Sequence, residues 1–409
     1  MKINVIGLGY IGLPTALMMA TCGEEVIGTD YNKQLVDKLN KGELTFEEKG
    51  LDELFKEALS NNIKFTTEYQ STDMYIIAVP TPYDKFSKKV DSTYVCEAVK
   101  SVMKVCKKGA IVVIESTISP GTIDKFVRPI IEKNGFVIGK DINLAHAPER
   151  IIPGNMVYEL KNNSRTIGAD SEEIGNKVAE IYKKLTKGQV IVTSIKIAEM
   201  TKVVENTFRA VNIAFANELA KICHHDGMDV YEVIKICNMH PRVNILNPGP
   251  GVGGHCISVD PWFLVGDYPS LASVVWESMK VNDGMPEYVL NRIAEIMQER
   301  GMKDYKRVGL YGLTYKENVD DFRESPTLQF LEYQRTHLAE PLKVYDPFIT
   351  KDIVENQYHN LDKFLEDTDL VVIMVKHNEI KENSDKLKGK IILDTQNILE
   401  KGKNIYKLA

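Results

Sequence analysis

Short apolar runs alternate with stretches of helical spacing from the first residues of the chain. The runs predict strands at residues 2–6, 25–29, 74–79 and 111–114, and the stretches between them predict helices at 15–21, 34–39 and 94–105. The third and fourth runs are almost wholly apolar, as is typical of parallel strands that are buried on both faces. This alternation of strands and helices predicts a doubly wound parallel sheet.

The middle of the chain has a different pattern. Residues 197–225 contain no glycine and no proline, and Val204, Phe208, Val211 and Phe215 recur at helical spacing. We therefore expect one helix of about 29 residues, roughly 43 Å long at about 1.5 Å per residue, that crosses between domains. Further helices are predicted at 229–237 and 285–300.

The last third returns to alternation, with strand-like runs at 307–311, 342–345, 370–375 and 390–393. The predicted fold class is α/β, with two doubly wound Rossmann-like domains joined by a central helical domain. We place the domains at residues 1–194, 195–302 and 303–409. The length of 409 residues agrees with two or three domains.

Composition and charge narrow the classes of function. The net charge of −6 disfavours a general nucleic-acid binder, so an anionic ligand would need local cations. Glycines at 7, 9 and 12 make the apolar N-terminus a strand, turn and helix rather than a secretion signal. We see no apolar run of about 20 residues and expect no membrane span. The six cysteines form no zinc or disulfide pattern, which predicts free thiols in the cytoplasm.

A glycine-rich turn follows the first predicted strand. In Gly7-x-Gly9-x-x-Gly12 the glycines allow a tight turn, approach of the backbone to a pyrophosphate, and close packing of helix on strand. Asp30 ends the second strand, where a carboxylate accepts hydrogen bonds from a ribose and repels a 2′-phosphate. The turn therefore predicts a dinucleotide site that prefers NAD to NADP, with a purely structural turn as the alternative.

Residues 247–256 form a second glycine-rich segment, which ends in Gly254-His255-Cys256. Such a loop can wrap closely around a ligand, and Asp260 follows the thiol. Cys256 is a candidate nucleophile, and a buried structural cysteine is the alternative. His255 and Cys256 have no partners at zinc-ligand spacing, so we predict no metal.

Two sets of polar residues could face a ligand. Lys202, Asn206 and Arg209 share one face of the long predicted helix, although a solvated stripe would look the same. Lys316 and Arg323 place two cations in the first loop of the second sheet, which would suit a phosphate-bearing ligand.

The order of motifs resembles that of the UDP-glucose/GDP-mannose dehydrogenase family over essentially the whole chain. The motifs are Gly-Leu-Gly-Tyr-Ile-Gly-Leu-Pro, Val-Pro-Thr-Pro, Glu-Ser-Thr, Pro-Glu-Arg, Lys-x-x-x-Asn, Gly-Gly-x-Cys-x-x-x-Asp and Tyr-Lys…Arg-Glu-Ser-Pro. Residues 206–218 and 240–245 are most similar to the branch of the family that acts on UDP-N-acetylhexosamines.

The resemblance implies two successive NAD-dependent oxidations of a sugar at carbon 6. The implied substrate is a UDP-N-acetylhexosamine, with the manno epimer as first choice and the gluco epimer as alternative, and the product a uronate for surface polysaccharides. Cys256 would form a thiohemiacetal and then a thioester. Lys202 would move protons or stabilise oxyanions, and Asn206 would donate to the same oxygen. Asp260 and Thr117 would position water and protons, with Glu149 a candidate for hydrolysis.

Further positions are carried over by the same resemblance. It also implies a homodimer or a higher homo-oligomer, with subunits paired through the central helix and Arg242 contributed by the partner subunit. The substrate-binding positions are Arg150, Ile151, Lys202, Asn206, Arg209, His240, Arg242, Gly253, Tyr315 and Lys316. The cofactor-binding positions are Gly7, Gly9, Tyr10, Ile11, Gly12, Asp30, Thr81, Thr117 and Arg323.

Two positions depart from the family's pattern. Pro153 stands where UDP-glucose enzymes carry a second glutamate, and Gln396 where relatives often have arginine or lysine. Two other functions would fit the fold. A single-hydride dehydrogenase of β-hydroxyacid type would not need Cys256, Lys316 or Arg323, and an NAD-binding sensor would bind the cofactor without turnover.

Overall fold

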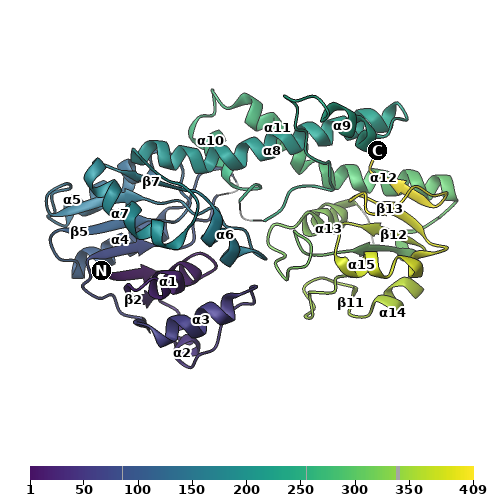
Figure 1. The fold of residues 1–409 in the computed structure, drawn as a ribbon. Coiled ribbons are helices and arrows are strands. Elements are labelled where there is room, and N and C mark those ends of the chain that lie inside the picture. Colours follow the sequence, from purple (N-terminus) through teal and green to yellow (C-terminus); the bar gives the residue numbers. More distant parts are fainter. Residues whose placement is uncertain (85, 255, 338–340) are drawn as a thin grey trace. The chain divides into compact units, whose positions relative to one another are not determined.

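The computed structural model describes residues 1–84, 86–254, 256–337 and 341–409 (Figure 1). Its compact units are residues 1–205 and 206–409, and each is described here by itself. The border between them falls within the long helix α8 (Ile195–His225). The presence of α8 confirms the helix predicted at 197–225. No helix in the described ranges is both long and apolar enough to cross a membrane.

The first unit is built on an eight-stranded sheet in the order β3-β2-β1-β4-β5-β6-β7-β8. These strands are β1 (Lys2–Ile6), β2 (Glu25–Thr29), β3 (Ile63–Thr66), β4 (Met74–Ile77), β5 (Ala110–Ile114), β6 (Ile142–His146), β7 (Arg165–Ala169) and β8 (Val190–Thr193). The order reverses direction between β1 and β4, which is the switch point at which doubly wound sheets bind ligands.

The predicted doubly wound parallel sheet is confirmed, with one antiparallel pairing that was not predicted. β6 and β7 are antiparallel, with Ala145 opposite Ala169, and the remaining pairs of this sheet are parallel. The connection holds only the seven-residue helix α6 (Met156–Asn162), about 10 Å long at about 1.5 Å per residue. Such a short helix does not carry the chain back along the sheet, so β7 enters in the opposite direction.

Helices cover both faces of this sheet, which explains the apolar runs. Along β4, Met74 and Ile76 belong to one core and Tyr75 and Ile77 to the other, because successive side chains of a strand point to opposite faces. The helical segments are α1 (Gly12–Thr21), α2 (Lys33–Asn40), α3 (Leu51–Ser60), α4 (Thr93–Val105), η1 (Ile123–Val127), α5 (Arg128–Lys133), α6 and α7 (Glu172–Leu185).

The second unit combines helices with a six-stranded parallel sheet in the order β11-β10-β9-β12-β13-β14. Its strands are β9 (Val308–Tyr311), β10 (Lys343–Tyr345), β11 (Gln357–Tyr358), β12 (Leu370–Ile373), β13 (Ile391–Asp394) and β14 (Ile405–Lys407). The four strands predicted here are confirmed as β9, β10, β12 and β13, while the short strands β11 and β14 were not predicted.

The helices of the second unit include those predicted at 229–237 and 285–300. They are the rest of α8, α9 (Val230–Cys237), α10 (Asp260–Asp267), α11 (Ser273–Asp283), α12 (Met285–Arg300), η2 (Tyr305–Arg307), α13 (Pro326–His337), α14 (Leu361–Glu366), α15 (Asn378–Glu382) and η3 (Ser384–Leu387). Pro286 in the first turn and Gly301 in the left-handed conformation mark the two ends of α12.

Candidate active site

The glycine-rich turn between β1 and α1 has the geometry that a dinucleotide requires. Gly7 has φ +89°, and its N–H donates to the carbonyl of Thr29 at 2.8 Å. A Cβ on Gly12 would lie 1.8 Å from the carbonyl oxygen of Gly7, so only glycine fits there. A Cβ on Gly9 would meet no protein atom within 4 Å, which leaves space for a pyrophosphate.

Asp30 is held at the end of β2, in reach of a ligand over the same turn. Its carboxylate accepts the N–H of Leu8 at 2.9 Å and the N–H of Asn32 at 2.8 Å, and its side chain is half-buried. The first turn of α1 has no acidic residue and no capping side chain, so its N–H groups can meet an anion. Tyr10, beside this turn, packs on Phe46 with ring centroids 4.5 Å apart. These residues fit a bound NAD.

Three of the family motifs quoted above lie in loops that follow the carboxyl ends of neighbouring strands. Thr81 comes after β4, Thr117 after β5, and Glu149 after β6. The β5 loop is fixed by a contact that sequence reasoning missed. Glu199, in the first turns of α8, accepts the N–H of Gly121 at 2.7 Å and that of Ile123 at 3.0 Å. Burial raises the pKa of Glu199, and these two hydrogen bonds oppose the rise.

A buried cluster of charges lies beneath the same loops. Arg165 on β7 is ion-paired with Glu149 and lies 3.6 Å from Glu115, which also accepts a hydrogen bond from Tyr182 at 3.0 Å. Burial raises the pKa of Glu115 to about 7, Arg165 opposes this rise, and the Glu149 carboxylate adds to it. The sequence analysis missed this cluster, because its members are far apart in the chain.

The Pro-Glu-Arg segment is held mainly by contacts within the first unit. One oxygen of Glu149 accepts the N–H of Arg150 at 2.6 Å and that of Ile151 at 3.1 Å. The Arg150 guanidinium donates to Thr166 at 2.9 Å and pairs with Glu205 at 2.8 Å. The backbone of Ile151 and the side chain of Arg150 are thus fixed in place before any substrate binds.

In the second unit the helix α8 and the start of α10 bring three predicted catalytic residues together. The side-chain amide of Asn206 donates to the Asp260 carboxylate at 2.6 Å, and both residues are buried. The N–H of Asp260 donates to the carbonyl of Cys256 at 2.8 Å. Cys256 is a half-buried cysteine outside any disulfide. Lys202, a buried residue that belongs to the first unit, lies one turn before Asn206 along α8.

The glycine-rich loop, residues 247–254, packs on the β9–α13 loop, residues 312–325. A Cβ on Gly253 would lie 2.6 Å from the carbonyl oxygen of Glu324, and one on Gly254 would lie 2.8 Å from the ring of Tyr315. The pKa of Tyr315 is raised by burial, by Asp321 and by the Cys256 thiol. The structure therefore brings Gly253, Tyr315 and Cys256 into one neighbourhood.

The cations predicted to face a ligand differ in their settings. Lys316 is half-buried in the β9–α13 loop, where Arg323 pairs with Asp321 at 2.6 Å. Arg209, His240 and Arg242 are exposed. His255 lies outside the described residues. Gln396 donates to the carbonyl of Met374 at 2.7 Å, which binds the end of β13 to the end of β12.

Comparison with known proteins agrees with this layout. Models of one family match the chain over residues 1–186 (NAD binding domain), 196–283 (central domain) and 309–401 (UDP binding domain). The chain belongs to the UDP-glucose/GDP-mannose dehydrogenase family. This confirms the resemblance of the motifs, and NAD is the cofactor of the first domain. Arg323, predicted to contact the cofactor, lies in the UDP binding domain of the family.

Relatives in this dehydrogenase family cover nearly the whole chain. A UDP-N-acetyl-D-mannosamine dehydrogenase from Methanococcus vannielii is 43% identical over 423 residues, which cover 100% of this chain and 95% of the relative. An NDP-N-acetyl-D-galactosaminuronic acid dehydrogenase from Ralstonia solanacearum is 38% identical and covers 96% of this chain and 95% of its own length. The solved structure of a UDP-D-ManNAc dehydrogenase from Pyrococcus horikoshii aligns with TM-score 0.92 and 37% identity, covering 100% of this chain and 99% of its own.

Proposed function

We propose that the protein oxidises UDP-N-acetyl-D-mannosamine at carbon 6 to UDP-N-acetyl-D-mannosaminuronate, in two successive NAD-dependent steps. The observation that carries this proposal is the placement of Cys256 beside Asp260, which itself binds Asn206 at 2.6 Å. The similarity to relatives named for this activity supports the choice of substrate. The family's UDP binding domain supports a UDP-linked sugar.

The residues of the chain explain how one site can carry out two oxidations. The Gly7 turn and Asp30 would hold NAD⁺, which would supply the hydride acceptor for each oxidation, two molecules for each sugar. The first oxidation gives an aldehyde, which donates a hydride poorly until a nucleophile adds to it. The Cys256 thiolate adds to the aldehyde carbon and forms a tetrahedral thiohemiacetal. Its oxidation gives a thioester, which water hydrolyses to the uronate and the free thiol.

Lys202 and Asn206 are proposed to act on the oxygen at the reacting carbon. The lysine takes the proton of the sugar hydroxyl or stabilises the developing oxyanion, and the Asn206 amide donates to the same oxygen. Both side chains are buried, and charge stabilisation is stronger where water is excluded. Asp260 orients the Asn206 amide through the hydrogen bond between them.

Hydrolysis of the thioester requires a base, and Glu149 is the proposed candidate, with Thr117 and Asp260 positioning water. One Glu149 oxygen accepts two backbone N–H groups and the other faces Arg165. A Glu149→Gln variant separates the two possible roles. If Glu149 is the base, the variant accumulates the Cys256 thioester, detectable by mass spectrometry. If Glu149 only holds the loop, substrate binding weakens and no thioester accumulates.

The substrate is tested by assaying NADH formation with UDP-N-acetyl-D-mannosamine, UDP-N-acetyl-D-glucosamine and UDP-glucose side by side. We expect the highest kcat/KM with the first sugar and a uronate product. If UDP-N-acetyl-D-glucosamine is the only one of the three sugars that is oxidised, the substrate is the gluco epimer. Cys256→Ala should form no uronate while still binding UDP. Full activity of this variant would instead favour a single-hydride dehydrogenase.

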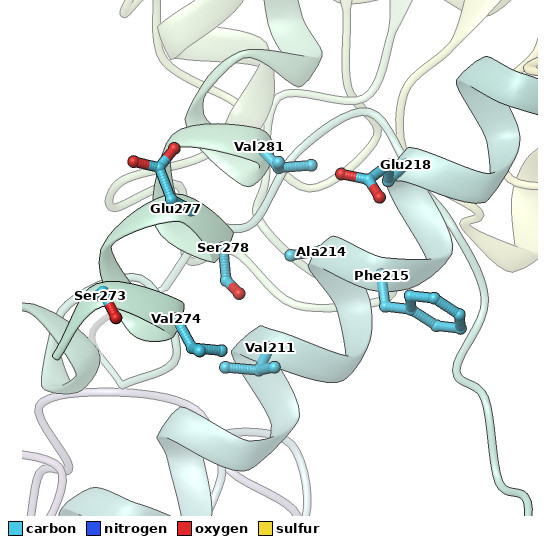
Figure 2. Close-up of a pocket in the computed structure, with 9 residues that line it drawn as sticks. All are labelled: Val211, Ala214, Phe215, Glu218, Ser273, Val274, Glu277, Ser278 and Val281. Atoms are coloured by element: carbon cyan, nitrogen blue, oxygen red, sulfur yellow. The ribbon is translucent and has the colours of Figure 1, made fainter.

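We also propose that the protein forms a homodimer through α8 and acts in the cytoplasm. Phe208, Phe215 and Ile222 are 66%, 50% and 49% exposed and recur every seven residues, as in helices that pair with another helix. A groove of about 440 Å³ between α8 and α11 is lined mainly by apolar side chains, with Val211 and Val274 facing each other (Figure 2). The six free cysteines support a reducing compartment, where a uronate for surface polysaccharides would be made.

A further inference from the structure

The second unit repeats the backbone turn that binds the cofactor in the first. Gly312 has φ +101° and donates to the carbonyl of Tyr345 at 2.7 Å, as Gly7, with φ +89°, donates to Thr29. Leu313 donates to the carboxylate of Asp346 at 2.6 Å, as Leu8 donates to that of Asp30. The second carboxylate oxygen accepts the N–H two residues later in both units, at 2.8 Å. Asp346 is thus the structural counterpart of Asp30.

The two carboxylates nevertheless have different surroundings. Asp30 is half-buried and open to a ligand, whereas Asp346 is 2% exposed. The Asp346 oxygen that binds Leu313 also receives the N–H of Thr314 at 3.1 Å and lies 3.2 Å from Nε2 of His377. Burial opposes ionisation of Asp346, but the contacts with His377 and the backbone N–H groups hold its pKa below the usual value. This carboxylate therefore cannot accept hydrogen bonds from a ribose.

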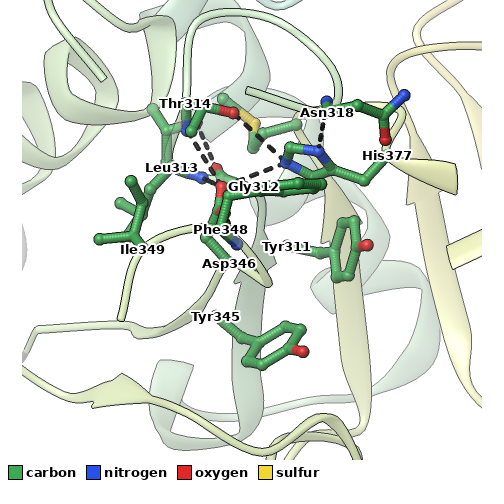
Figure 3. Close-up of polar contacts among 12 residues, drawn as sticks. Tyr311, Gly312, Leu313, Thr314, Asn318, Tyr345, Asp346, Phe348, Ile349 and His377 are labelled. Carbon is green, nitrogen blue, oxygen red and sulfur yellow. Dashed lines mark hydrogen bonds and ion pairs between the residues drawn. The ribbon is translucent and has the colours of Figure 1, made fainter. Parts of the chain in front are cut away.

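The His377 side chain connects Asp346 to the β9–α13 loop through hydrogen bonds at its two ring nitrogens (Figure 3). The ring is fully buried just after β12, at the switch point of the sheet. Nδ1 accepts the N–H of Asn318 at 2.9 Å, so Nε2 carries the proton and donates to Asp346. The Asn318 side chain in turn accepts the N–H of Asn378 at 3.0 Å.

The same contacts fix the residues on either side of Lys316. The Thr314 hydroxyl lies 3.3 Å from Nε2 of His377 and donates to the carbonyl of Lys316 at 2.8 Å. Asn318 is held at φ +57°, a left-handed conformation that is rare outside glycine. The loop is therefore tied down at residues 314, 316 and 318, and Tyr315 lies between the first two.

We propose that His377 and Asp346 are positioning residues for the UDP-sugar: they hold the β9–α13 loop so that Tyr315 and Lys316 are set for the nucleotide sugar before it binds. This inference rests on the proposed function and deepens it. The carboxylate that binds a ribose in the first unit has become, in the second, the anchor of a substrate loop. A preordered loop binds more tightly because ordering it costs no free energy at the moment of binding.

The test compares three variants with the full-length protein. His377→Ala removes the contact with Asn318. His377→Asn keeps an acceptor near Nδ1. Thr368→Val removes a buried hydroxyl that bonds to Phe364 at 2.8 Å, just before β12 and away from the loop, and serves as the matched control for lost stability. The dissociation constants for UDP and for NAD⁺ are measured separately by calorimetry, without turnover.

We expect His377→Ala to weaken UDP binding about tenfold and NAD⁺ binding by less than about twofold, and to raise the KM for the nucleotide sugar more than it lowers kcat. His377→Asn should recover much of the UDP affinity, and Thr368→Val should keep the wild-type value. Hydrogen exchange of residues 314–323 should become faster in His377→Ala only. Unchanged UDP affinity in His377→Ala would overturn the proposal, whether or not the exchange becomes faster.

Two controls keep the outcome interpretable. If His377→Ala does not fold, Asn318→Gly tests whether the order of the same loop sets the UDP affinity. It removes the side-chain bond to Asn378 at the exposed position 318 and keeps the backbone N–H that donates to His377. It should weaken UDP binding about threefold, and wild-type affinity would count against the proposal. Wild-type protein that binds no UDP would refute the proposed function, whereas UDP binding insensitive to His377 would refute only this inference.

Discussion

At the scale of single residues, the reasons for the glycines in the cofactor turn can be separated. A Cβ on Gly12 would collide with the Gly7 carbonyl at 1.8 Å, whereas a Cβ on Gly9 would occupy space that no protein atom fills. The motif in the sequence predicts the turn but does not distinguish these roles. The distances distinguish them, because the fold itself requires glycine at position 12, whereas the space for a ligand explains glycine at position 9.

Gly9→Ala and Gly12→Ala should therefore fail in different ways. We expect Gly12→Ala to lower the free energy of unfolding by about 1–3 kcal/mol, as overpacking does. Gly9→Ala should keep the wild-type melting temperature and raise the KM for NAD⁺ about tenfold, with the KM for the sugar unchanged. Thermal melts and initial rates measure both. A destabilised Gly9→Ala protein with normal NAD⁺ binding would contradict the account.

Glu115 gives a second prediction at the residue scale. Its pKa is raised to about 7 in the folded protein, from an ordinary value near 4.5, because it is buried. The folded state then holds a proton that the unfolded state has lost. The free energy by which this bound proton stabilises the folded state is fully present below about pH 4.5 and is lost as the pH rises through about 7.

Glu115→Gln should therefore remove this dependence on pH. Urea denaturation between pH 5 and pH 8 should show wild-type protein losing on the order of 2–3 kcal/mol relative to Glu115→Gln. The exposed Glu173→Gln variant is the control and should follow the wild type. Parallel curves for wild type and Glu115→Gln would show that the buried carboxyl titrates normally.

At the scale of elements, the strands and helices with strong periodicity were predictable. The strands at 2–6 and 25–29 and the helix at 285–300 agree residue for residue with β1, β2 and α12. The antiparallel pairing of β6 with β7 was not predictable, because it depends on how the short helix α6 turns the chain. The charges around Arg165 depend on that pairing, so they were missed as well.

The exposed face of α8 gives a prediction for this scale. If a second copy covers Phe208 and Phe215, replacing both with glutamate should turn the dimer into a monomer, since two buried charges would lie unpaired in the interface. Sedimentation equilibrium measures the change. Val137→Glu, at another exposed apolar position, should leave the dimer intact. A wild-type monomer at micromolar concentration would refute the proposed dimer.

At the scale of the whole molecule, the sequence predicts two sheets separated by a long helix because each part has its own periodicity. It also carries a hint that was not used. The dipeptide Gly312-Leu313 directly follows β9, as Gly7-Leu8 directly follows β1. At the end of β10 stands Tyr345-Asp346, as Thr29-Asp30 stands at the end of β2. Only the structure reveals that the second aspartate is sealed by His377, a residue 31 positions away.

The central claim is that one thiol lets a single site remove four electrons from the sugar. It is tested most directly by supplying limiting UDP-N-acetyl-D-mannosamine with excess NAD⁺ and counting the NADH formed when the sugar is exhausted. We expect two NADH for each sugar, with no free aldehyde in solution. One NADH per sugar, or an aldehyde as the final product of the wild-type enzyme, would contradict it.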